Sequence, residues 1–266
     1  MSKILVLGSE GQIGNNLTSK LKKDKNNEII ECDIACNLSH DLRVKSKYLD
    51  EVFKNSDFVY FLAYDVGGST YLNKNQNSND FIDNNLMIMK NTFSYLEKYK
   101  IPFIFASTQM SNMTHSPYGT LKRIGEFYTN NLGGHVVRLW NIYGIENDPA
   151  KTHVITDFIN SAIKDQSIKI KTTGQEQRQF LHADDCSRAL IKIQQNFELI
   201  EKLSVRFGSQ AIVASIDYIK RDDTYFIYNN KTKKFIKLNL LSFIKKIENA
   251  GCGEILLTNV HHDGTS

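Results

Sequence analysis

The stretch Lys3-Ile4-Leu5-Val6-Leu7-Gly8-Ser9-Glu10-Gly11-Gln12-Ile13-Gly14 decides the fold of this chain. Its first five residues form an apolar run of the length of a buried parallel strand. Three glycines follow at three-residue spacing, and a helical pattern covers residues 13–21. The N-terminus of such a helix points free N–H groups and a positive dipole end at the loop, which suits a diphosphate. Strand, glycine loop and helix in this order predict a dinucleotide-binding unit.

Each glycine of this loop has its own expected role. Gly8 allows the tight turn, Gly11 lets the backbone approach a phosphate, and Gly14 lets the helix pack closely against the strand. Gln12 and Ile13 lie between them and are expected to line the same cofactor site. Because no Lys-Ser/Thr pair closes the loop, a nucleotide-hydrolysing P-loop is disfavoured.

The second predicted strand, residues 28–33, ends in the carboxylate of Asp33. A Rossmann unit places there the acid that accepts hydrogen bonds from the adenosine ribose hydroxyls. An acid at this position repels a ribose 2′-phosphate, so NAD is favoured over NADP. A solvated aspartate that closes a strand is the alternative. Asp41 and Leu42 in the next loop are candidates to hold the adenine edge, with a simple turn equally open.

Composition limits the function classes. The 266 residues are 41% apolar and 23% charged, with a net charge of +4 and basic residues that are spread rather than striped. A nucleic-acid partner therefore has little support. The four cysteines show no metal-ligand spacing, so no metal site is predicted. With strand one directly at the start and no apolar run of spanning length, we expect no membrane partner and a cytoplasmic location.

Strand and helix patterns alternate through the first half of the chain. Such alternation predicts an α/β fold with a Rossmann-like, doubly wound parallel sheet. Ligands then bind beyond the carboxyl ends of the strands. The expected strands span residues 3–7, 28–33, 57–63, 102–107 and 135–140, and the expected helices residues 13–21, 44–54, 80–99 and 118–130, with a Gly/Asn-rich loop at residues 65–79.

The fourth strand introduces the candidate catalytic residues. It ends in Ser107 and Thr108, and Tyr118 and Lys122 follow on one face of the next helix. There the Lys122 ammonium is expected to lower the pKa of the Tyr118 phenol, so that the tyrosine exchanges protons near neutral pH. The Thr108 hydroxyl can hydrogen-bond the same substrate oxygen. The alternative is a half-buried helical tyrosine beside an exposed lysine.

Taken in order, these motifs resemble the extended short-chain dehydrogenases/reductases, the sugar-nucleotide epimerase/dehydratase group, over residues 1–195. The resemblance implies NAD as cofactor and a nucleotide sugar as substrate, with Thr108, Tyr118 and Lys122 carrying the chemistry. It also implies a possible homodimer formed through a four-helix bundle. The motifs are Gly8/Gly11/Gly14, Asp33, Leu62-Ala63, Asp83-Asn84-Asn85, Ser107-Thr108, Tyr118/Lys122, residues 138–144 and residues 178–185.

The same resemblance assigns further contacts. Leu62, Ala63, Asn85 and Ser107, with Tyr118 and Lys122, are expected to line the cofactor site. Asn141 and Arg178 are expected to approach the diphosphate of the sugar nucleotide. Arginine suits this role because its planar fork donates to two oxygens at once.

Departures from the family patterns narrow the expected reaction. The loop at residues 65–69 resembles that of GDP-mannose 3,5-epimerases, but Met110 stands near the position of their catalytic cysteine. The Asp-Glu pair of 4,6-dehydratases is replaced by Gln109-Met110, which disfavours dehydration. Reversible oxidation at a sugar carbon remains, with C4 expected, in an epimerase, a 4-oxidase or a 4-reductase.

A different resemblance begins near residue 196. Residues 207–217 read as an apolar strand that ends in Asp217, and a second strand pattern covers residues 251–258. These segments resemble the cyclase subunit of imidazole glycerol phosphate synthase, a (β/α)8 barrel of histidine biosynthesis. By that resemblance Asp217 matches a catalytic acid and residues 263–265 a ligand-binding strand end, while His261 replaces an acid.

The C-terminal fragment covers only part of a barrel, and a barrel interior needs side chains from all its strands. We therefore expect two domains, an NAD-binding domain at residues 1–195 with a shortened substrate lobe and a partial barrel-like fragment at residues 196–266. The alternative function is a non-catalytic NAD-binding remnant fused to an inactive piece of the cyclase.

Overall fold

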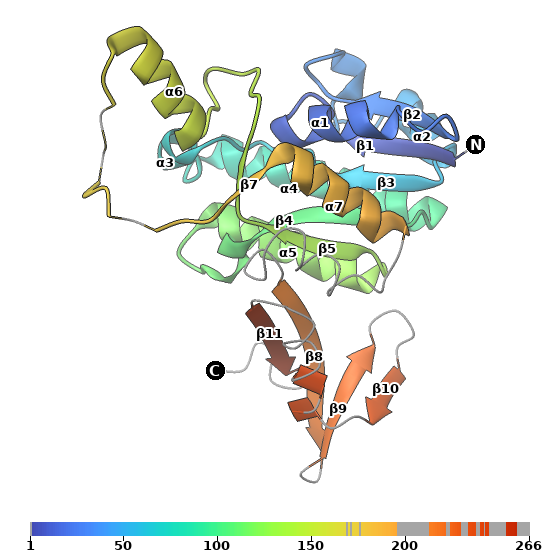
Figure 1. Cartoon of the computed structure of the whole chain (residues 1–266). Coiled ribbons are helices and arrows are strands. Elements are labelled where there is room, and N and C mark those ends of the chain that lie inside the picture. The colour runs from blue at the N-terminus through green and yellow to red at the C-terminus, as the bar shows by residue number, and fades with distance from the viewer. Residues whose placement is uncertain are drawn as a thin grey trace. The chain divides into compact units, whose positions relative to one another are not determined.

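A computed structural model of the chain (Figure 1) divides into two compact units, Met1–Ile191 and Lys192–Ser266. Each unit is described by itself below. The described residues are 2–168, 170, 172–175, 177–195, 213–221, 224–229, 234–237, 240, 241, 243, 244 and 254–259.

The first unit contains a parallel sheet, and the predicted doubly wound fold is confirmed. The sheet has the order β2-β1-β3-β4-β5, so the strand order reverses between β1 and β3. A crevice for a ligand opens at such a reversal, beyond the carboxyl ends of the strands. The strands of this sheet are β1 (Ser2–Leu7), β2 (Asn27–Cys32), β3 (Phe58–Phe61), β4 (Phe103–Thr108) and β5 (His135–Leu139).

The predicted helices are present, and one additional helix corrects the sequence analysis. Part of the expected Gly/Asn-rich loop is helical, because Gly68 starts α3 and its carbonyl accepts from the Leu72 N–H at 3.0 Å. Ser46, Ser78 and Ser116 each cap the start of a helix with a side-chain oxygen. The helices up to β5 are α1 (Gln12–Leu21), α2 (Lys47–Lys54), α3 (Ser69–Asn75), α4 (Asn79–Tyr99) and α5 (Pro117–Asn131).

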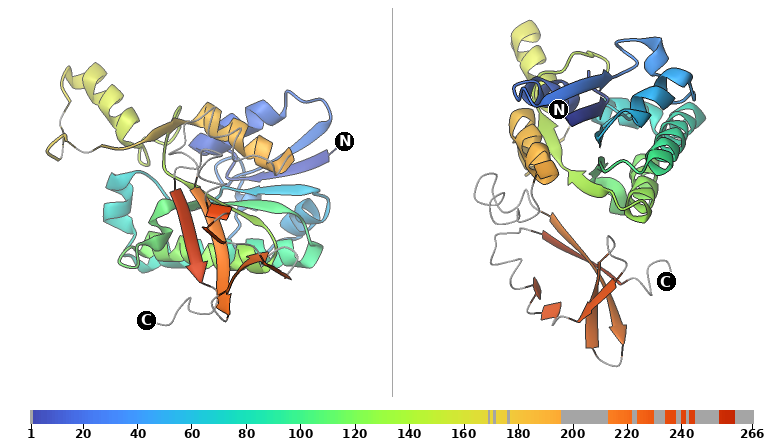
Figure 2. Two further views of the ribbon diagram at one scale, coloured as in Figure 1. Left: turned by 60° about the horizontal axis from the view of Figure 1, so that its bottom comes forward. Right: turned by 90° about the vertical axis from the view of Figure 1, so that its right-hand side faces the viewer.

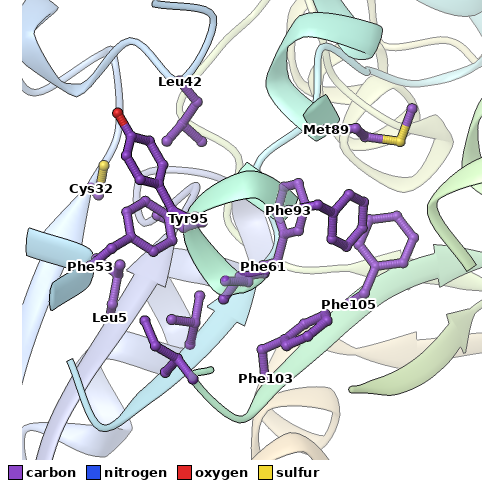
Figure 3. Packing of buried hydrophobic residues seen from close by; sticks show 14 of the residues in the cluster. Leu5, Cys32, Leu42, Phe53, Phe61, Met89, Phe93, Tyr95, Phe103 and Phe105 are labelled. Carbon is purple, nitrogen blue, oxygen red and sulfur yellow. The ribbon is translucent and has the colours of Figure 1, made fainter. Parts of the chain in front are cut away.

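An aromatic core fills one face of the sheet (Figure 3). Phe61 and Phe105 project from neighbouring strands, and Phe93 of α4 lies 5.4 Å and 5.7 Å from their ring centroids. Helix α2 adds Phe53, whose ring stacks on Tyr95 of α4 at 4.8 Å. Burying each large apolar side chain contributes about 1.5–3 kcal/mol. This core fixes the carboxyl ends of β3 and β4 relative to α4.

The opposite face of the sheet is covered by α1 and by α7 (Ala183–Gln195), as Figures 1 and 2 show. Tyr60 of β3 donates its hydroxyl to the Leu190 carbonyl at 3.5 Å. Lys20 of α1 pairs with Asp184 of α7. These contacts hold α7 against β3 and α1.

Between β5 and α7 the chain forms a small parallel pair, β6 (Asn141–Tyr143) with β7 (Phe180–His182), and the helix α6 (Val154–Asp165). No residue of α6 is buried, although Ile159 and Ile163 are apolar and 54% and 77% exposed. The described part of this region therefore packs more loosely than the sheet. No helix in the described ranges has the length and apolar character needed to cross a bilayer.

The second unit contains a mixed sheet of order β10-β9-β8-β11 in its described residues. β8 (Val213–Arg221) pairs in parallel with β11 (Glu254–Asn259), as neighbouring strands of a β/α barrel do. β9 (Thr224–Asn229) and β10 (Lys234–Lys237) form an antiparallel hairpin beside β8.

The prediction that a strand ends at Asp217 is wrong, because β8 continues four residues beyond it to Arg221. The hairpin explains the difference, since β8 must extend to pair with β9 through the register Arg221 to Thr224. Residues 207–212, 251–253, His261 and residues 263–265 lie outside the described residues.

Candidate functional site

A cavity of about 700 Å³ lies beyond the carboxyl ends of the sheet, at the predicted place. Its wall combines the glycine loop, the loops after β2 and β3, the end of β4, the start of α5 and the segment after β5. All of these elements belong to the first unit.

The glycine loop brings backbone to the cavity wall. Gly8 has φ +82°, and a Cβ there would lie 2.7 Å from the Ala63 nitrogen. A Cβ on Gly14 would lie 2.0 Å from the Gly8 carbonyl oxygen, so α1 starts in direct contact with the turn. At Gly11 the nearest atom is 3.4 Å away, which is ordinary contact. Gly8 and Gly14 are thus required by packing, and Gly11 leaves room on the cavity side.

Gln12 connects this loop to β6. With its amide oriented to satisfy both partners, Gln12 donates to the Ile142 carbonyl and accepts from the Gly144 N–H, each at 3.2 Å. A Cβ on Gly144 would lie 2.9 Å from that of Ala183, so the residue after β6 closely approaches the start of α7. Gln12 and Ile13 both line the cavity.

The loop after β2 supplies the acidic end of the cavity. Asp33 uses both carboxylate oxygens on backbone, accepting from Glu10 N–H at 3.0 Å and Ala35 N–H at 2.9 Å. Asp41 accepts two bonds from Arg43, at 2.9 and 2.8 Å. This guanidinium holds the pKa of Asp41 below its usual value. Leu42 is buried yet also lines the cavity.

Sequence reasoning missed Arg43. It donates to the Asn84 amide oxygen at 3.0 Å, and Asn84 donates to Asp65 at 3.1 Å. The only sequence signal was an arginine two residues after an acid, a spacing common in turns. Asp41, the residue predicted to hold the adenine edge, is therefore not a lone acid but part of an ion pair with Arg43.

Tyr118 stands beside Thr108 at the end of β4. The Ser116 hydroxyl caps α5 by accepting from Gly119 N–H at 3.2 Å. A Cβ on Gly119 would lie 2.1 Å from the Met110 carbonyl oxygen, so only glycine lets the start of α5 approach the segment after β4 this closely. The Thr108 hydroxyl is then near enough to the Tyr118 phenol to lower the pKa of that phenol.

The structure corrects the expected pKa of Tyr118. Burial raises it to about 12, and the nearby Thr108 hydroxyl offsets only part of that rise. Lys122 is not among the groups that shift it, because its ammonium donates elsewhere, to the Ala106 carbonyl at 2.6 Å. The phenol is therefore neutral at neutral pH in this state.

Lys122 is buried, with 4% of its surface exposed. The alternative of an exposed lysine on this helix is thus wrong. Its ammonium lies 3.7 Å from the ring centroid of Tyr64 and 4.9 Å from that of Phe105, which are cation–π contacts. Burial lowers the pKa of Lys122 to about 7, and the nearby charge of Glu126 opposes that shift.

Asn85 does not reach the cavity wall, unlike the other predicted cofactor residues. It is fully buried and holds the loop after β3, accepting from Asp65 N–H at 2.8 Å and donating to the Asp65 carbonyl at 3.1 Å. Asp65 itself lines the cavity and accepts from Tyr71 and Lys151. Burial tends to raise the pKa of Asp65, but these hydrogen bonds hold it below its usual value. Leu62, Ala63 and Ser107 line the cavity as predicted.

The substrate candidates lie on the outer part of the wall. Asn141 donates from its amide to the Gln179 carbonyl at 3.0 Å, which ties β6 to the segment before β7. Arg178 lines the cavity and is exposed. Glu146 and His153 also line the cavity and form a hydrogen-bonded pair there.

The residues present fit a dinucleotide. Backbone fills the Cβ positions of Gly8 and Gly14, so the loop exposes main chain where a diphosphate needs N–H donors. Asp33 lies at the wall beyond β2 and offers oxygens for ribose hydroxyls. Within the described ranges, no group of three His, Cys, Asp or Glu residues is placed to hold a metal ion.

Solved structures share this fold. UDP-glucuronic acid 4-epimerase from Bacillus cereus, in complex with UDP-glucuronic acid and NAD, has a TM-score of 0.61, 22% identity and 73% coverage of each chain. dTDP-glucose 4,6-dehydratase from Bacillus anthracis, in complex with NAD, has a TM-score of 0.58 at 19% identity, covering 73% of this chain and 71% of that one. At such identities the likeness shows the fold alone.

The C-terminal part matches a histidine biosynthesis protein model over residues 150–266. Imidazole glycerol phosphate synthase subunit HisF of Chlorobium limicola is 34% identical over 86 residues, which are 32% of this chain and 34% of that protein. The subunit of Natranaerobius thermophilus is 44% identical over 69 residues, 26% of this chain and 28% of that protein. The chain thus spans about a third or less of these two relatives, and the predicted resemblance is confirmed.

The model of the NAD-dependent epimerase/dehydratase family matches residues 4–205. These residues include the glycine loop, the β4 hydroxyls, the Tyr118 and Lys122 pair and the outer wall with Asn141 and Arg178. A match of this extent confirms the family resemblance, the enzyme class and the NAD cofactor that were inferred from the sequence. Through its first two hundred residues, therefore, the chain belongs to the NAD-dependent epimerase/dehydratase family.

Proposed function

We propose that this chain is an NAD-dependent oxidoreductase or epimerase that acts on a nucleotide sugar, with hydride transfer at a sugar carbon, expected to be C4. The observation that carries the proposal is that Thr108, Tyr118 and the buried Lys122 all line one cavity, whose wall also contains the glycine loop.

Tyr118 is the proposed acid/base. As a phenolate it accepts the proton of the sugar hydroxyl, and as a phenol it returns that proton when the carbonyl is reduced. Bound NAD supplies the acceptor for the hydride that leaves the same carbon. The Thr108 hydroxyl lowers the pKa of the phenol and so favours the phenolate. We propose that a charged Lys122 adds electrostatic stabilisation once substrate and NAD are bound. Tyr64 packs against Tyr118 at 5.9 Å between ring centroids and limits water around the pair.

The residues after β4 support an epimerase, oxidase or reductase over two alternatives. Gln109 and Met110 both line the cavity, so this part of the wall offers an amide and a thioether. Neither side chain can protonate a leaving hydroxyl as the acid of a 4,6-dehydratase does. Neither replaces the thiol of a 3,5-epimerase.

The comparisons support the substrate class. The Bacillus cereus structure is that of a 4-epimerase with UDP-glucuronic acid and NAD, and it shares the fold over 73% of this chain. On the present chain Asn141 and Arg178 are proposed to bind the nucleotide diphosphate, and Gly8, Gly11, Asp33 and the other cavity residues to bind NAD.

The test is turnover with a defined tyrosine change. The purified chain is incubated with NAD and a panel of UDP-, GDP- and dTDP-sugars, and NADH absorbance and sugar products are followed. We expect turnover with one nucleotide sugar and a loss of at least a hundredfold in Tyr118→Phe, since acid–base catalysis contributes about 10²–10⁴-fold. Tyr99→Phe is the matched control, because Tyr99 lies on α4 outside the cavity. Equal turnover in Tyr118→Phe would refute the assignment.

A second candidate is a non-catalytic NAD-binding remnant fused to an inactive piece of the cyclase. The overlap of the two family matches at residues 150–205 favours it, because the substrate lobe and the cyclase-like segment share that stretch. In this proposal the chain has two domains, an NAD-binding domain at residues 1–195 and a cyclase-like fragment at residues 196–266. NAD binding by the wild-type chain without turnover of any sugar in the panel would support this candidate over the enzyme.

The cavity-remote face of α4 and α5 supports the proposed homodimer. Leu86 and Met87 of α4 and Phe127 and Tyr128 of α5 are each between 38% and 50% exposed. We expect a dimer by light scattering, and a monomer for Met87→Glu/Phe127→Glu. The free, buried thiols of Cys32 and Cys186 fit a reducing compartment, and we propose the cytoplasm.

A further inference from the structure

Helix α5 presents three polar side chains to β4 at intervals of four residues, Tyr118, Lys122 and Glu126. Tyr118 lies beside Thr108, Lys122 donates to the Ala106 carbonyl, and Glu126 accepts from the Ser107 hydroxyl. Side chains from three successive turns of α5 therefore approach three consecutive residues of β4. The proposed chemistry uses the first two side chains and leaves the third without a role.

Glu126 is 3% exposed and tightly held. One carboxylate oxygen accepts from Ser107 Oγ at 2.5 Å and from Arg138 Nε at 2.8 Å, and the other accepts from Arg138 Nη2 at 2.7 Å. Burial alone would raise the pKa of Glu126, but the bonds from Arg138 and Ser107 hold it below its usual value. A buried carboxylate with a bidentate arginine thus remains ionised at neutral pH.

The groups around Lys122 show why the negative charge of Glu126 affects its pKa. Tyr64 after β3 and Tyr118 on α5 are the titratable groups that face the ammonium besides Glu126, and both are neutral at neutral pH because burial raises their pKa values. β4 contributes a carbonyl and the Phe105 ring. Glu126 is therefore the carboxylate that opposes the desolvation of Lys122, with Arg138 on β5 and Arg123 on α5 behind it.

We propose that Glu126 is a positioning residue that favours the ammonium form of the buried Lys122, and that Ser107 and Arg138 hold the Glu126 carboxylate in place to do so. The part of this inference that concerns catalysis rests on the proposed function. Charges in a buried site interact far more strongly than in water, so a single carboxylate one helical turn away changes the proton affinity of the lysine.

The direct test measures Lys122 without turnover. Protein with ¹³C-labelled lysine is titrated by NMR in the absence of NAD and substrate, and the Lys122 signal is assigned by its loss in Lys122→Met. We expect a wild-type midpoint near 7. In Glu126→Gln it should fall by about one pH unit, the size of a single charge at partly buried separation. Glu126→Asp, which retains the charge, should restore most of the shift.

Two further variants protect this test. If Glu126→Gln does not fold, Glu126→Gln/Arg138→Met replaces the whole ion pair by neutral side chains. The midpoint should still fall, because Glu126, and not Arg138, is the charged group that shifts the pKa of Lys122. Asp50→Asn is the matched control, since it removes a carboxylate that pairs with Lys98 on the protein surface. An unchanged Lys122 midpoint in the Glu126 variants would overturn the inference.

Turnover supplies the second measurement. The charged lysine is lost as the pH rises, so the basic limb of the kcat profile should move to lower pH by the same amount in Glu126→Gln. A purely structural role would lower kcat at every pH without moving the limb, and would overturn the inference. A shifted NMR midpoint in a protein that turns over no sugar would refute the proposed function while supporting the role of Glu126.

Discussion

The two walls of the cavity are built differently. The inner wall, residues 8–14 and 103–131, includes β4, in which every residue is buried, and Lys122 and Glu126, which are 4% and 3% exposed. The outer wall, the described residues of 140–182 that line the cavity, includes the exposed Arg178, and the neighbouring helix α6 has no buried residue. The proposed chemistry thus rests on a close-packed scaffold, and substrate recognition rests on loosely packed chain. Substitutions in the inner wall should affect folding, whereas those in the outer wall should affect mainly binding.

The largest effect is expected for Arg138→Met in the inner wall. It leaves Glu126 buried without its charge partner, which costs about 3–5 kcal/mol of folding free energy. The loss should be greatest at neutral pH, since the ionised carboxylate is then unpaired, and should shrink as Glu126 protonates in acid. Urea unfolding at several pH values measures both effects.

The sign follows from the wild-type carboxylate. The pKa of Glu126 lies below its usual value of 4.5, so its contribution to stability is present above that pH and disappears as the pH falls through the lowered pKa. Lys98→Met is the control, because it breaks a surface pair with Asp50 and should unfold like wild type at every pH. A pH-independent loss in Arg138→Met would contradict the pairing.

The next effect concerns the glycine loop. In Gly14→Ala the new Cβ would meet the Gly8 carbonyl oxygen at 2.0 Å, and the forced backbone shift should cost about 1–3 kcal/mol and abolish NAD binding. Gly11→Ala adds its methyl at an ordinary 3.4 Å and should keep wild-type stability while weakening NAD binding. Calorimetry with and without NAD separates the two. Equal stability of both variants would show that α1 does not need to touch the turn.

For a substitution in the outer wall we expect weaker substrate binding and unchanged stability. Arg178→Ala should raise KM for the nucleotide sugar about tenfold, the worth of one charge-assisted hydrogen bond, and leave kcat and the unfolding midpoint unchanged. Arg188→Ala is the matched control, since this arginine of α7 pairs with Asp184 outside the cavity. A lowered unfolding midpoint in Arg178→Ala would give the outer wall a structural role as well.

The smallest effect is expected for Lys151→Met. Its ammonium bonds the Asp65 carboxylate at 3.1 Å, but the lysine side chain is 36% exposed, so the pair contributes less than about 1 kcal/mol. Hydrogen exchange of residues 146–153 should accelerate, while exchange in β4 stays unchanged. Uniform acceleration across the first unit would mean that the two walls unfold together.

Local patterns were enough to predict most of the inner wall. The apolar runs of β1 and β4, the glycine spacing and the interval from Tyr118 to Lys122 each follow from strand or helix geometry. Helix α3 was missed because its stability depends on contacts with distant parts of the chain. Gly68, for example, which starts the helix, donates its N–H to the Lys151 carbonyl at 3.0 Å.

The sequence also could not predict the charge states. A Tyr-x-x-x-Lys interval says nothing of how deeply the pair is buried, and burial decides the pKa of both side chains here. The position of Asn85 depended on the path of the loop after β3, which no local pattern encodes. In the second unit, β8 extends past Asp217 because it pairs with β9, and this pairing too is not encoded in a local pattern.

The side chain of Gln12 connects the two proposed binding regions. Gln12 directly follows Gly11 of the glycine loop, which is proposed to bind the NAD diphosphate, and its amide bonds a carbonyl and an N–H of the segment that contains Asn141. A shorter residue at position 12 would therefore disturb cofactor and sugar affinity in parallel, as though two separate sites had been mutated at once.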